Sequence, residues 1–297
     1  MKVWNNMNNA GSCWQIIFAA QETTPPLLEE FLEEYFEVVA CDYNDDGQEI
    51  LIGYTSKDFD SCDFRKQAAA RGIELPEFCQ KLLTSENWLK DNVIEFAPVE
   101  VEDFLVYGIH EKQAPKTAKL PIKIYAATAF GSEHQTTKSC LKAICELNRM
   151  KAPHANILDV GCGSGILSLG AAKLWGPQTQ ITAVDIDQEA VWVTRQNALD
   201  NNVAELINSE VSNGYQAEIV QKNAPYDIIF ANILARPLID MAPDLAASLT
   251  PGGYAVLSGF INDQEEWVIN AHTNQGLKLV KIYELDNWRA ALMEKPE

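Results

Sequence analysis

The sequence predicts two domains, a small α+β domain followed by a larger α/β domain whose mostly parallel sheet is covered by helices. The length of 297 residues exceeds the usual size of one domain. From about residue 121 onward, short apolar runs alternate with helical patterns, which is typical of a parallel sheet. Within that region a glycine-rich turn at 157–166 is followed by an apolar run that ends on carboxylates at 183–187. Strand, glycine loop, helix and second strand form one half of a nucleotide-binding sheet.

The first 83 residues predict a strand, a helix, two strands, a helix and a last strand. The apolar run Cys13–Ala20 is the first strand, and Pro25 with Pro26 opens a helix with apolar residues at three- and four-residue spacing. The elements expected after that helix are strands at 36–43 and 49–55 joined by a turn at 44–47, a helix at 58–71, and a strand within 74–83. This order is typical of a ferredoxin-like sandwich. Because it carries no catalytic motif, residues 1–83 are interpreted as a domain that docks a substrate.

Residues 84–120 are interpreted as a linker and transition segment that could act as a hinge. They contain one expected strand, Val101–Tyr107, which Gly108 ends, and an exposed polar loop at 111–119.

Residues 121–297 predict the α/β domain. Its expected strands are 156–160, 181–185, 205–208, 226–231, 253–258, 278–285 and 288–294, and its expected helices lie near 166–174, 188–201, 234–248 and 263–274. The last two strands form a hairpin, so one strand must run antiparallel to the others. A ligand is expected over the carboxyl ends of the strands.

The glycine loop indicates a cofactor that contains adenosine but is not a dinucleotide. Gly161, Gly163 and Gly165 have the spacing G-x-G-x-G, and Ile166 stands where the dinucleotide fingerprint has its third glycine. Asp159 before the loop would repel a pyrophosphate but suits a cationic ligand. Asp185, at the end of the next strand, can accept hydrogen bonds from both hydroxyls of a ribose. The alternative is a tight strand-to-helix turn without a ligand.

A second motif, within residues 129–137, lies before the predicted strand 156–160 that leads into the glycine loop. Phe130, Gly131, His134 and Thr137 are candidate cofactor-binding residues, because a glycine loop with histidine and paired threonines could form a lid there. In the simpler interpretation, Thr136 or Thr137 caps the helix that follows.

Asn232 is the candidate catalytic residue. It directly follows the apolar run 226–231, which places it at the carboxyl end of a strand, where a ligand is expected. Its amide oxygen can accept a hydrogen bond from a substrate amine and so align the nitrogen lone pair. The alternative role, which could coexist, is to cap the following helix.

Composition excludes several classes of function. A net charge of −19 argues against direct nucleic-acid binding, which needs a basic face; the acidity could attract a basic partner or only aid solubility. The 7 cysteines and 4 histidines show no metal-binding spacing or disulfide framework, so we expect no metal and a reduced, cytoplasmic protein. Cys162 in the glycine loop is interpreted as a small residue that fits a crowded turn, rather than as a nucleophile.

We expect a monomer with neither a secretory signal nor a membrane helix.

With these motifs in this order, the chain resembles the bacterial ribosomal protein L-eleven methyltransferase family of class I S-adenosylmethionine-dependent enzymes. The segments that carry the resemblance are Asp159–Leu167, Asp185-Ile186-Asp187 and Ala231–Leu234. The loop at 130–137 is one residue shorter than the family pattern and has Glu133 where glycine is expected.

The resemblance implies a seven-stranded, Rossmann-like class I methyltransferase sheet, an N-terminal domain that recognises the substrate, and S-adenosyl-L-methionine as cofactor. It also implies methylation of lysine side chains or of the N-terminal α-amine of large-subunit protein L-eleven. Thr137, Gly161, Asp185 and Asn232 would then contact the cofactor or the reacting centre. Two alternatives remain, a class I methyltransferase acting on RNA or a small molecule, and a regulator that binds the cofactor without catalysis. No obligatory general base is visible; His134 could accept a proton or orient its loop.

Overall fold

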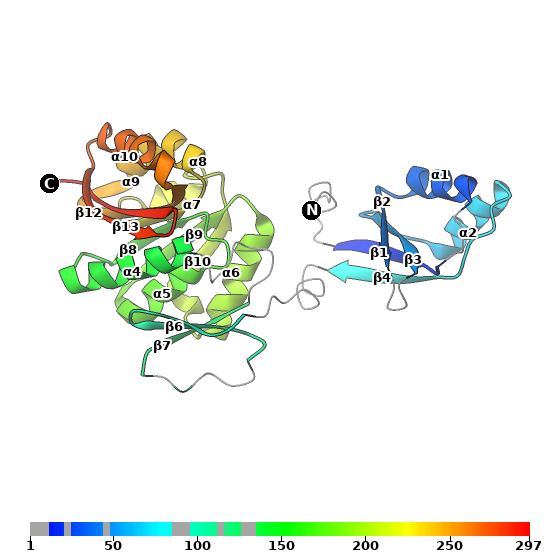
Figure 1. Ribbon diagram of the computed structural model, residues 1–297, viewed down its shortest axis with the longest axis horizontal. Helices are drawn as coiled ribbons and strands as arrows, with labels where there is room; N and C mark the ends of the chain where they lie inside the picture. The colour runs from blue at the N-terminus through cyan, green and yellow to red at the C-terminus, as the bar shows by residue number, and fades with distance from the viewer. Residues whose placement is uncertain are drawn as a thin grey trace. The chain divides into compact units, whose positions relative to one another are not determined.

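The computed structural model describes residues 12–20, 25–43, 48–84, 96–111, 116, 118–125 and 135–297. The chain divides into two compact units, Met1–Asn92 and Val93–Glu297 (Figure 1). Each unit is described by itself.

The first unit is a four-stranded antiparallel sheet with two helices on one face. In chain order its elements are β1 (Ser12–Phe18), α1 (Pro26–Tyr35), β2 (Val38–Tyr43), β3 (Glu49–Thr55), α2 (Ser61–Ala70) and β4 (Phe78–Thr84). The strands lie in the order β2-β3-β1-β4, and every neighbouring pair is antiparallel. This is the ferredoxin-like arrangement that the sequence predicts.

The core of the first unit is largely aromatic. Phe18 of β1 packs with Phe31 of α1 and Phe64 of α2, and all three are at most 1% exposed. Gly53 of β3 leaves room for the ring of Phe36, which the Cβ of any larger residue would overlap. Asp60 caps α2 by accepting hydrogen bonds from the backbone N–H groups of Cys62 and Asp63.

The segment predicted as a linker, 84–120, is divided between the units. The boundary lies between Asn92 and Val93, and the segment's later part forms β5 (Val99–Val101) and β6 (Phe104–Gly108) of the second unit. These pair with β7 (Leu120–Ile124) in a three-stranded sheet of order β5-β6-β7. The single strand predicted at 101–107 is therefore a hairpin. The chain turns at Glu102, whose φ is +48°.

The second unit is built on a seven-stranded mixed sheet. Its strands are β8 (Asn156–Val160), β9 (Gln180–Asp185), β10 (Ile207–Val211), β11 (Tyr226–Asn232), β12 (Leu249–Ile261), β13 (Lys278–Leu285) and β14 (Trp288–Glu294). They lie in the order β10-β9-β8-β11-β12-β14-β13. The first five are parallel, and β14 runs antiparallel to both of its neighbours, which confirms the predicted closing hairpin. This is the class I methyltransferase fold.

Helices cover both faces of the large sheet (Figure 1). One apolar core lies against α4 (Gln135–Met150), α5 (Ile166–Trp175) and α6 (Gln188–Asp200), and β6 and β7 also contribute to it. The other lies against α7 (Glu218–Asn223), α8 (Ala235–Asp240), α9 (Ala242–Ser248) and α10 (Glu265–Thr273). Successive strand residues supply opposite cores, as Ile157 and Leu158 of β8 do.

The helix predicted at 234–248 is two helices. α8 ends at Asp240 and α9 begins at Ala242, with Pro243 in its first turn. Proline has no N–H to donate, and its ring would clash with the carbonyl of Ile239 in a continuous helix. The short helix α7 is not predicted by the sequence analysis.

Candidate functional site

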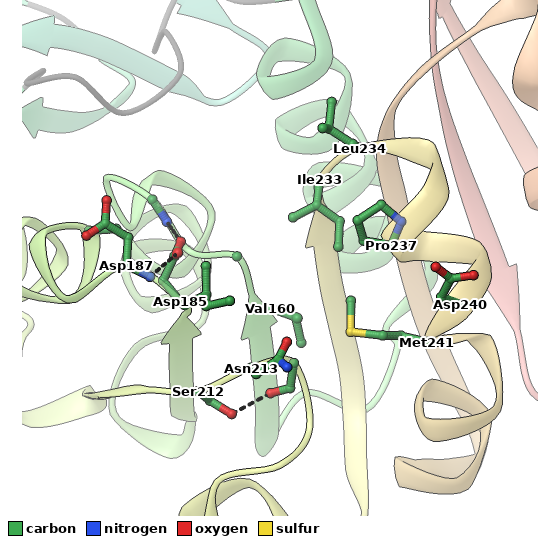
Figure 2. Close-up of a pocket in the computed structure, with 15 residues that line it drawn as sticks. Val160, Asp185, Asp187, Ser212, Asn213, Ile233, Leu234, Pro237, Asp240 and Met241 are labelled. Carbon is green, nitrogen blue, oxygen red and sulfur yellow. Dashed lines mark hydrogen bonds between the residues drawn. The ribbon is translucent and has the colours of Figure 1, made fainter. Parts of the chain in front are cut away.

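A pocket of about 580 Å³ opens at the carboxyl ends of β8, β9, β10 and β11 (Figure 2). Its volume lies within the range of roughly 300–1,000 Å³ that small-molecule sites occupy. The lining residues are Val160, Gly161, Gly163, Asp185, Ile186, Asp187, Ala190, Ser212, Asn213, Gly214, Ile233, Leu234, Pro237, Asp240 and Met241. The location matches the edge of the sheet at which the sequence predicts a ligand.

The glycine loop between β8 and α5 needs glycine at each predicted position. Gly161, Gly163 and Gly165 have φ values of +72°, +54° and +76°, a conformation that is costly for residues with a Cβ. A Cβ at Gly161 would overlap the side chain of Ile233, and one at Gly165 would lie 2.9 Å from the Cγ2 of Thr194. Gly161 and Gly165 therefore let the loop lie directly against Ile233, just after β11, and against α6.

Asp185 lies beside this loop at the end of β9. Its Oδ2 accepts a 2.9 Å hydrogen bond from the N–H of Gly163, and its Oδ1 accepts one of 3.0 Å from the N–H of Asp187. Figure 2 shows the carboxylate held between these two groups. Burial raises the pKa of Asp185, while the backbone donors from Asp187 and Gly163 oppose that shift. Each carboxylate oxygen keeps a lone pair for another donor, so the group can accept both hydroxyls of a ribose.

Asp159 does not line the pocket, although its position before the loop predicts that it suits a cationic ligand. Its side chain is 1% exposed and accepts hydrogen bonds from the N–H of Ser168 at 3.2 Å and from its Oγ at 2.6 Å. Ser168 lies in the first turn of α5, where backbone N–H groups lack helical partners. Burial raises the pKa of Asp159 to about 6. Its observed role is to accept hydrogen bonds from the first turn of α5.

Further residues of the pocket were missed by the sequence analysis. Ile186 follows Asp185 and is 71% exposed, so it offers an apolar surface to a flat ring. Asn213 and Ser212 follow β10 and come from a segment without a recognisable motif. An amide at Asn213 can both donate to and accept from the edge of a nucleobase. The signal that could have found them is their position after a third parallel strand at the same edge of the sheet.

The opposite wall of the pocket is formed by residues that follow β11. Ile233, Leu234 and Pro237 lie across the pocket from Asp185 in Figure 2. Asn232 directly precedes them as the last residue of β11, and it is half-buried. It does not cap α8, because Leu234 occupies the cap position and no side chain makes a cap hydrogen bond there.

The remaining predicted residues have different outcomes. Thr137 is 3% exposed, and because α4 begins at Gln135, Thr136 and Thr137 lie within its first turn rather than at its cap. Phe130, Gly131 and His134 lie outside the described residues.

Cys162 is buried, and its Sγ accepts a hydrogen bond from Thr194 at 3.3 Å. Burial raises the pKa of this thiol well above its ordinary value. A thiol held in its protonated form is a poor nucleophile, which agrees with the structural role predicted for it.

The described residues form neither a metal-binding cluster nor a membrane-spanning helix. No group of three or more His, Cys, Asp or Glu residues in this part of the chain is placed to hold a metal ion. None of its helices is long and apolar enough to cross a membrane.

Comparisons with known proteins agree on one family. The family model for ribosomal protein L11 methyltransferase (PrmA) matches residues 15–296. Curated proteins named ribosomal protein L11 methyltransferase include one from Mesorhizobium japonicum, 34% identical over 84% of this chain and 86% of its own length. Another, from Brucella suis, is 34% identical over 92% of this chain and 94% of its own.

A solved structure supports the fold. The ribosomal protein L11 methylase from Lactobacillus delbrueckii subsp. bulgaricus has a TM-score of 0.59 and 23% identity, covering 69% of this chain and all of that one.

Proposed function

The chain belongs to the ribosomal protein L11 methyltransferase family, and on that premise we propose that it methylates amino groups of ribosomal protein L11. It is an S-adenosylmethionine-dependent protein methyltransferase. The proposed acceptors are lysine side chains or the N-terminal α-amine. We propose that it acts as a monomer in the cytoplasm, where ribosomal proteins are made, and that it does not bind nucleic acid directly.

The observation that carries this function is the position of Asp185 beside the glycine loop in one pocket. The carboxylate already bonds to the N–H of Gly163, so the cofactor's ribose and its amino-acid end would occupy adjoining parts of the site. Gly161 and Gly163 would hold the amino-acid end, and Asp185 the ribose. Ile186 and Asn213 would then contact the base.

When bound, S-adenosylmethionine supplies a methyl group on a sulfonium, which is a good leaving group. The protein mainly has to position the acceptor and exclude water. A lysine amine with an ordinary pKa near ~10.4 must lose a proton before it can attack. The apolar wall of Ile233, Leu234 and Met241 would favour the neutral amine by desolvation.

We propose Asn232 as the catalytic residue that orients this amine. Its amide oxygen would accept an N–H bond and direct the nitrogen lone pair toward the methyl group. Asn232 is suited to this role because Ile233 and Leu234, its immediate successors, line the pocket.

We propose that the first unit docks the protein substrate. Its helices pack against the face of the sheet that carries Ile16 and Phe18. The alternate residues Gln15 and Ile17 lie on the other face and are half-buried. Tyr54 lies there too and accepts a 3.1 Å hydrogen bond from Gln15 at its hydroxyl. This face offers mixed apolar and polar groups to a protein surface.

The test is incubation of the chain with radiolabelled S-adenosylmethionine and total protein from ribosomes that lack the methylation, in parallel with a sample of the ribosomal RNA from the same ribosomes. We expect label on one large-subunit protein, and we expect Asn232→Ala to reduce its rate of labelling by about a hundredfold. Asn208→Ala, at an exposed asparagine of β10, is the matched control and should label at the wild-type rate.

Each remaining outcome points to a different function. Label in ribosomal RNA alone would make the chain an RNA methyltransferase. Cofactor binding without label in any fraction would favour a regulator that does not catalyse.

A further inference from the structure

Helix α6 packs against the glycine loop and forms hydrogen bonds to its backbone. Thr194 and Asn197 are both fully buried and lie three residues apart, so they share one face of the helix. The Oγ1 of Thr194 donates a 3.0 Å hydrogen bond to the carbonyl of Gly163, and the Nδ2 of Asn197 donates one of 2.8 Å to the carbonyl of Ser164. Two successive carbonyls of the loop are thus fixed by α6, and with them the orientation of the peptide planes.

The same asparagine also binds the main chain just beyond β7. The Oδ1 of Asn197 accepts a 2.7 Å hydrogen bond from the N–H of Tyr125, and its Nδ2 lies 3.4 Å from the carbonyl of that residue. Four residues later, Asn201 at the C-cap of α6 accepts a 3.0 Å bond from the N–H of Lys123 and donates one of 2.6 Å to its carbonyl. β7 is an edge strand, and the two amides satisfy the groups that such a strand leaves open.

The spacing of the two elements explains this match. Four residues of a helix advance about 6 Å, and two residues of a strand about 6.6 Å. Alternate strand residues, 123 and 125, can therefore meet side chains at 197 and 201. Of the two asparagines, only Asn197 also forms a hydrogen bond to the glycine loop.

We propose that Asn197 is a positioning residue for cofactor binding, which joins the conformation of the glycine loop to the end of β7. Asn201 makes the same kind of strand contact and donates a further 2.8 Å bond to the backbone carbonyl of Asn197, but its side chain has no bond to the loop. This proposal rests on the assignment of S-adenosylmethionine to the pocket and does not depend on which protein or amine receives the methyl group.

The experiment measures binding of S-adenosylhomocysteine to the full chain by calorimetry and the melting temperature of the same samples without ligand. Asn197→Ala and Asn201→Ala each remove one buried amide and its strand contacts. We expect both to lower the melting temperature by similar amounts. Asn197→Ala alone should raise the dissociation constant, by about tenfold or more, because the Ser164 carbonyl loses its donor. Asn201→Ala should stay within about twofold of wild type.

A second variant keeps the test decisive if Asn197→Ala does not fold. Thr194→Val preserves the shape of the side chain and removes only the hydroxyl, whose one proton is shared between the Gly163 carbonyl and the Sγ of Cys162. We expect weaker binding from a chain that remains folded. Equal loss of affinity in Asn197→Ala and Asn201→Ala, or unchanged affinity in both Asn197→Ala and Thr194→Val, would overturn the proposal. A wild-type chain that does not bind S-adenosylhomocysteine would overturn the cofactor assignment as well. If the chain binds S-adenosylhomocysteine but does not methylate L11, only the proposed protein substrate would be overturned.

Discussion

The two units bury different kinds of side chain. Among the described residues of the first unit, Thr55 is the one buried polar residue, and the core consists mainly of packed rings. The second unit buries many polar residues, among them Asp159, Ser168, Thr194 and Asn197 close to the glycine loop and Ser258, His272 and Arg289 elsewhere. A buried polar group costs free energy unless it is hydrogen-bonded, and the four close to the loop have partners. Around the glycine loop, the hydrogen bonds of buried polar side chains therefore help to fix the backbone.

The largest effects are expected when a buried aromatic ring is removed from the core of each unit in turn. Phe64→Ala should destabilise the first unit by roughly 3–5 kcal/mol, because the ring is fully buried among other aromatic side chains. Binding of S-adenosylhomocysteine should be unchanged, while methylation of the protein substrate should fall. Phe230→Ala in β11 is the matched variant and should impair both. Denaturant unfolding and calorimetry measure these effects. Loss of cofactor binding in Phe64→Ala would show that the units are not functionally separate.

The buried carboxyl of Asp159 gives the second unit a specific pH dependence. Because its pKa in the folded chain is about 6, above the ordinary ~3.9, the folded chain retains a proton that the unfolded chain loses. Its contribution to the free energy of unfolding is therefore greatest below pH ~4 and falls as pH rises toward ~6. Asn at this position cannot ionise and still accepts from Ser168.

We therefore expect the stability of Asp159→Asn relative to wild type to increase between pH ~4 and ~6, by up to about 3 kcal/mol. Urea unfolding at several pH values measures the difference. A difference independent of pH would contradict a raised pKa at this carboxyl.

Glycines with positive φ in the two units provide a third comparison. Gly161 and Gly72 have φ values of +72° and +70°, and alanine at either position should cost about 1–2 kcal/mol of backbone strain. A Cβ at Gly72 meets open space, whereas one at Gly161 overlaps Ile233. Gly161→Ala should therefore weaken S-adenosylhomocysteine binding by at least about tenfold. Gly72→Ala should leave the affinity unchanged, and equal affinities in the two variants would argue against the loop as a binding element.

The smallest expected effect concerns two aspartates that cap helices. Asp60 caps α2 in the first unit, and Asp187 caps α6 beside the pocket by accepting a 2.8 Å bond from the N–H of Glu189. Alanine at either position should lower stability by about 1 kcal/mol. Only Asp187→Ala should also change the dissociation constant of S-adenosylhomocysteine, because Asp187 lines the pocket. Matching losses of stability without a difference in affinity would remove Asp187 from the site.

Much of the fold follows from patterns that are local in the chain. The strands 278–285 and 288–294 have the predicted bounds, because apolar runs on either side of Asp286-Asn287 specify a hairpin. The apolar pattern predicted one strand at 101–107, although the chain forms a hairpin at 99–108. It also joined α8 to α9, since the effect of Pro243 depends on which helical turn it enters.

The sequence by itself determined the glycine loop and the order of strands and helices, because spacing and backbone preference act over a few neighbouring residues. Only the tertiary structure decided which of two similar acids faces the pocket. Asp159 and Asp185 lie at the ends of neighbouring strands, yet one is buried against α5 and the other lines the cavity. The tertiary structure also decided the role of Asn197, whose partner Tyr125 lies 72 residues away in the chain. Such contacts depend on how helices and strands pack against one another, and a pattern in neighbouring residues does not predict that packing.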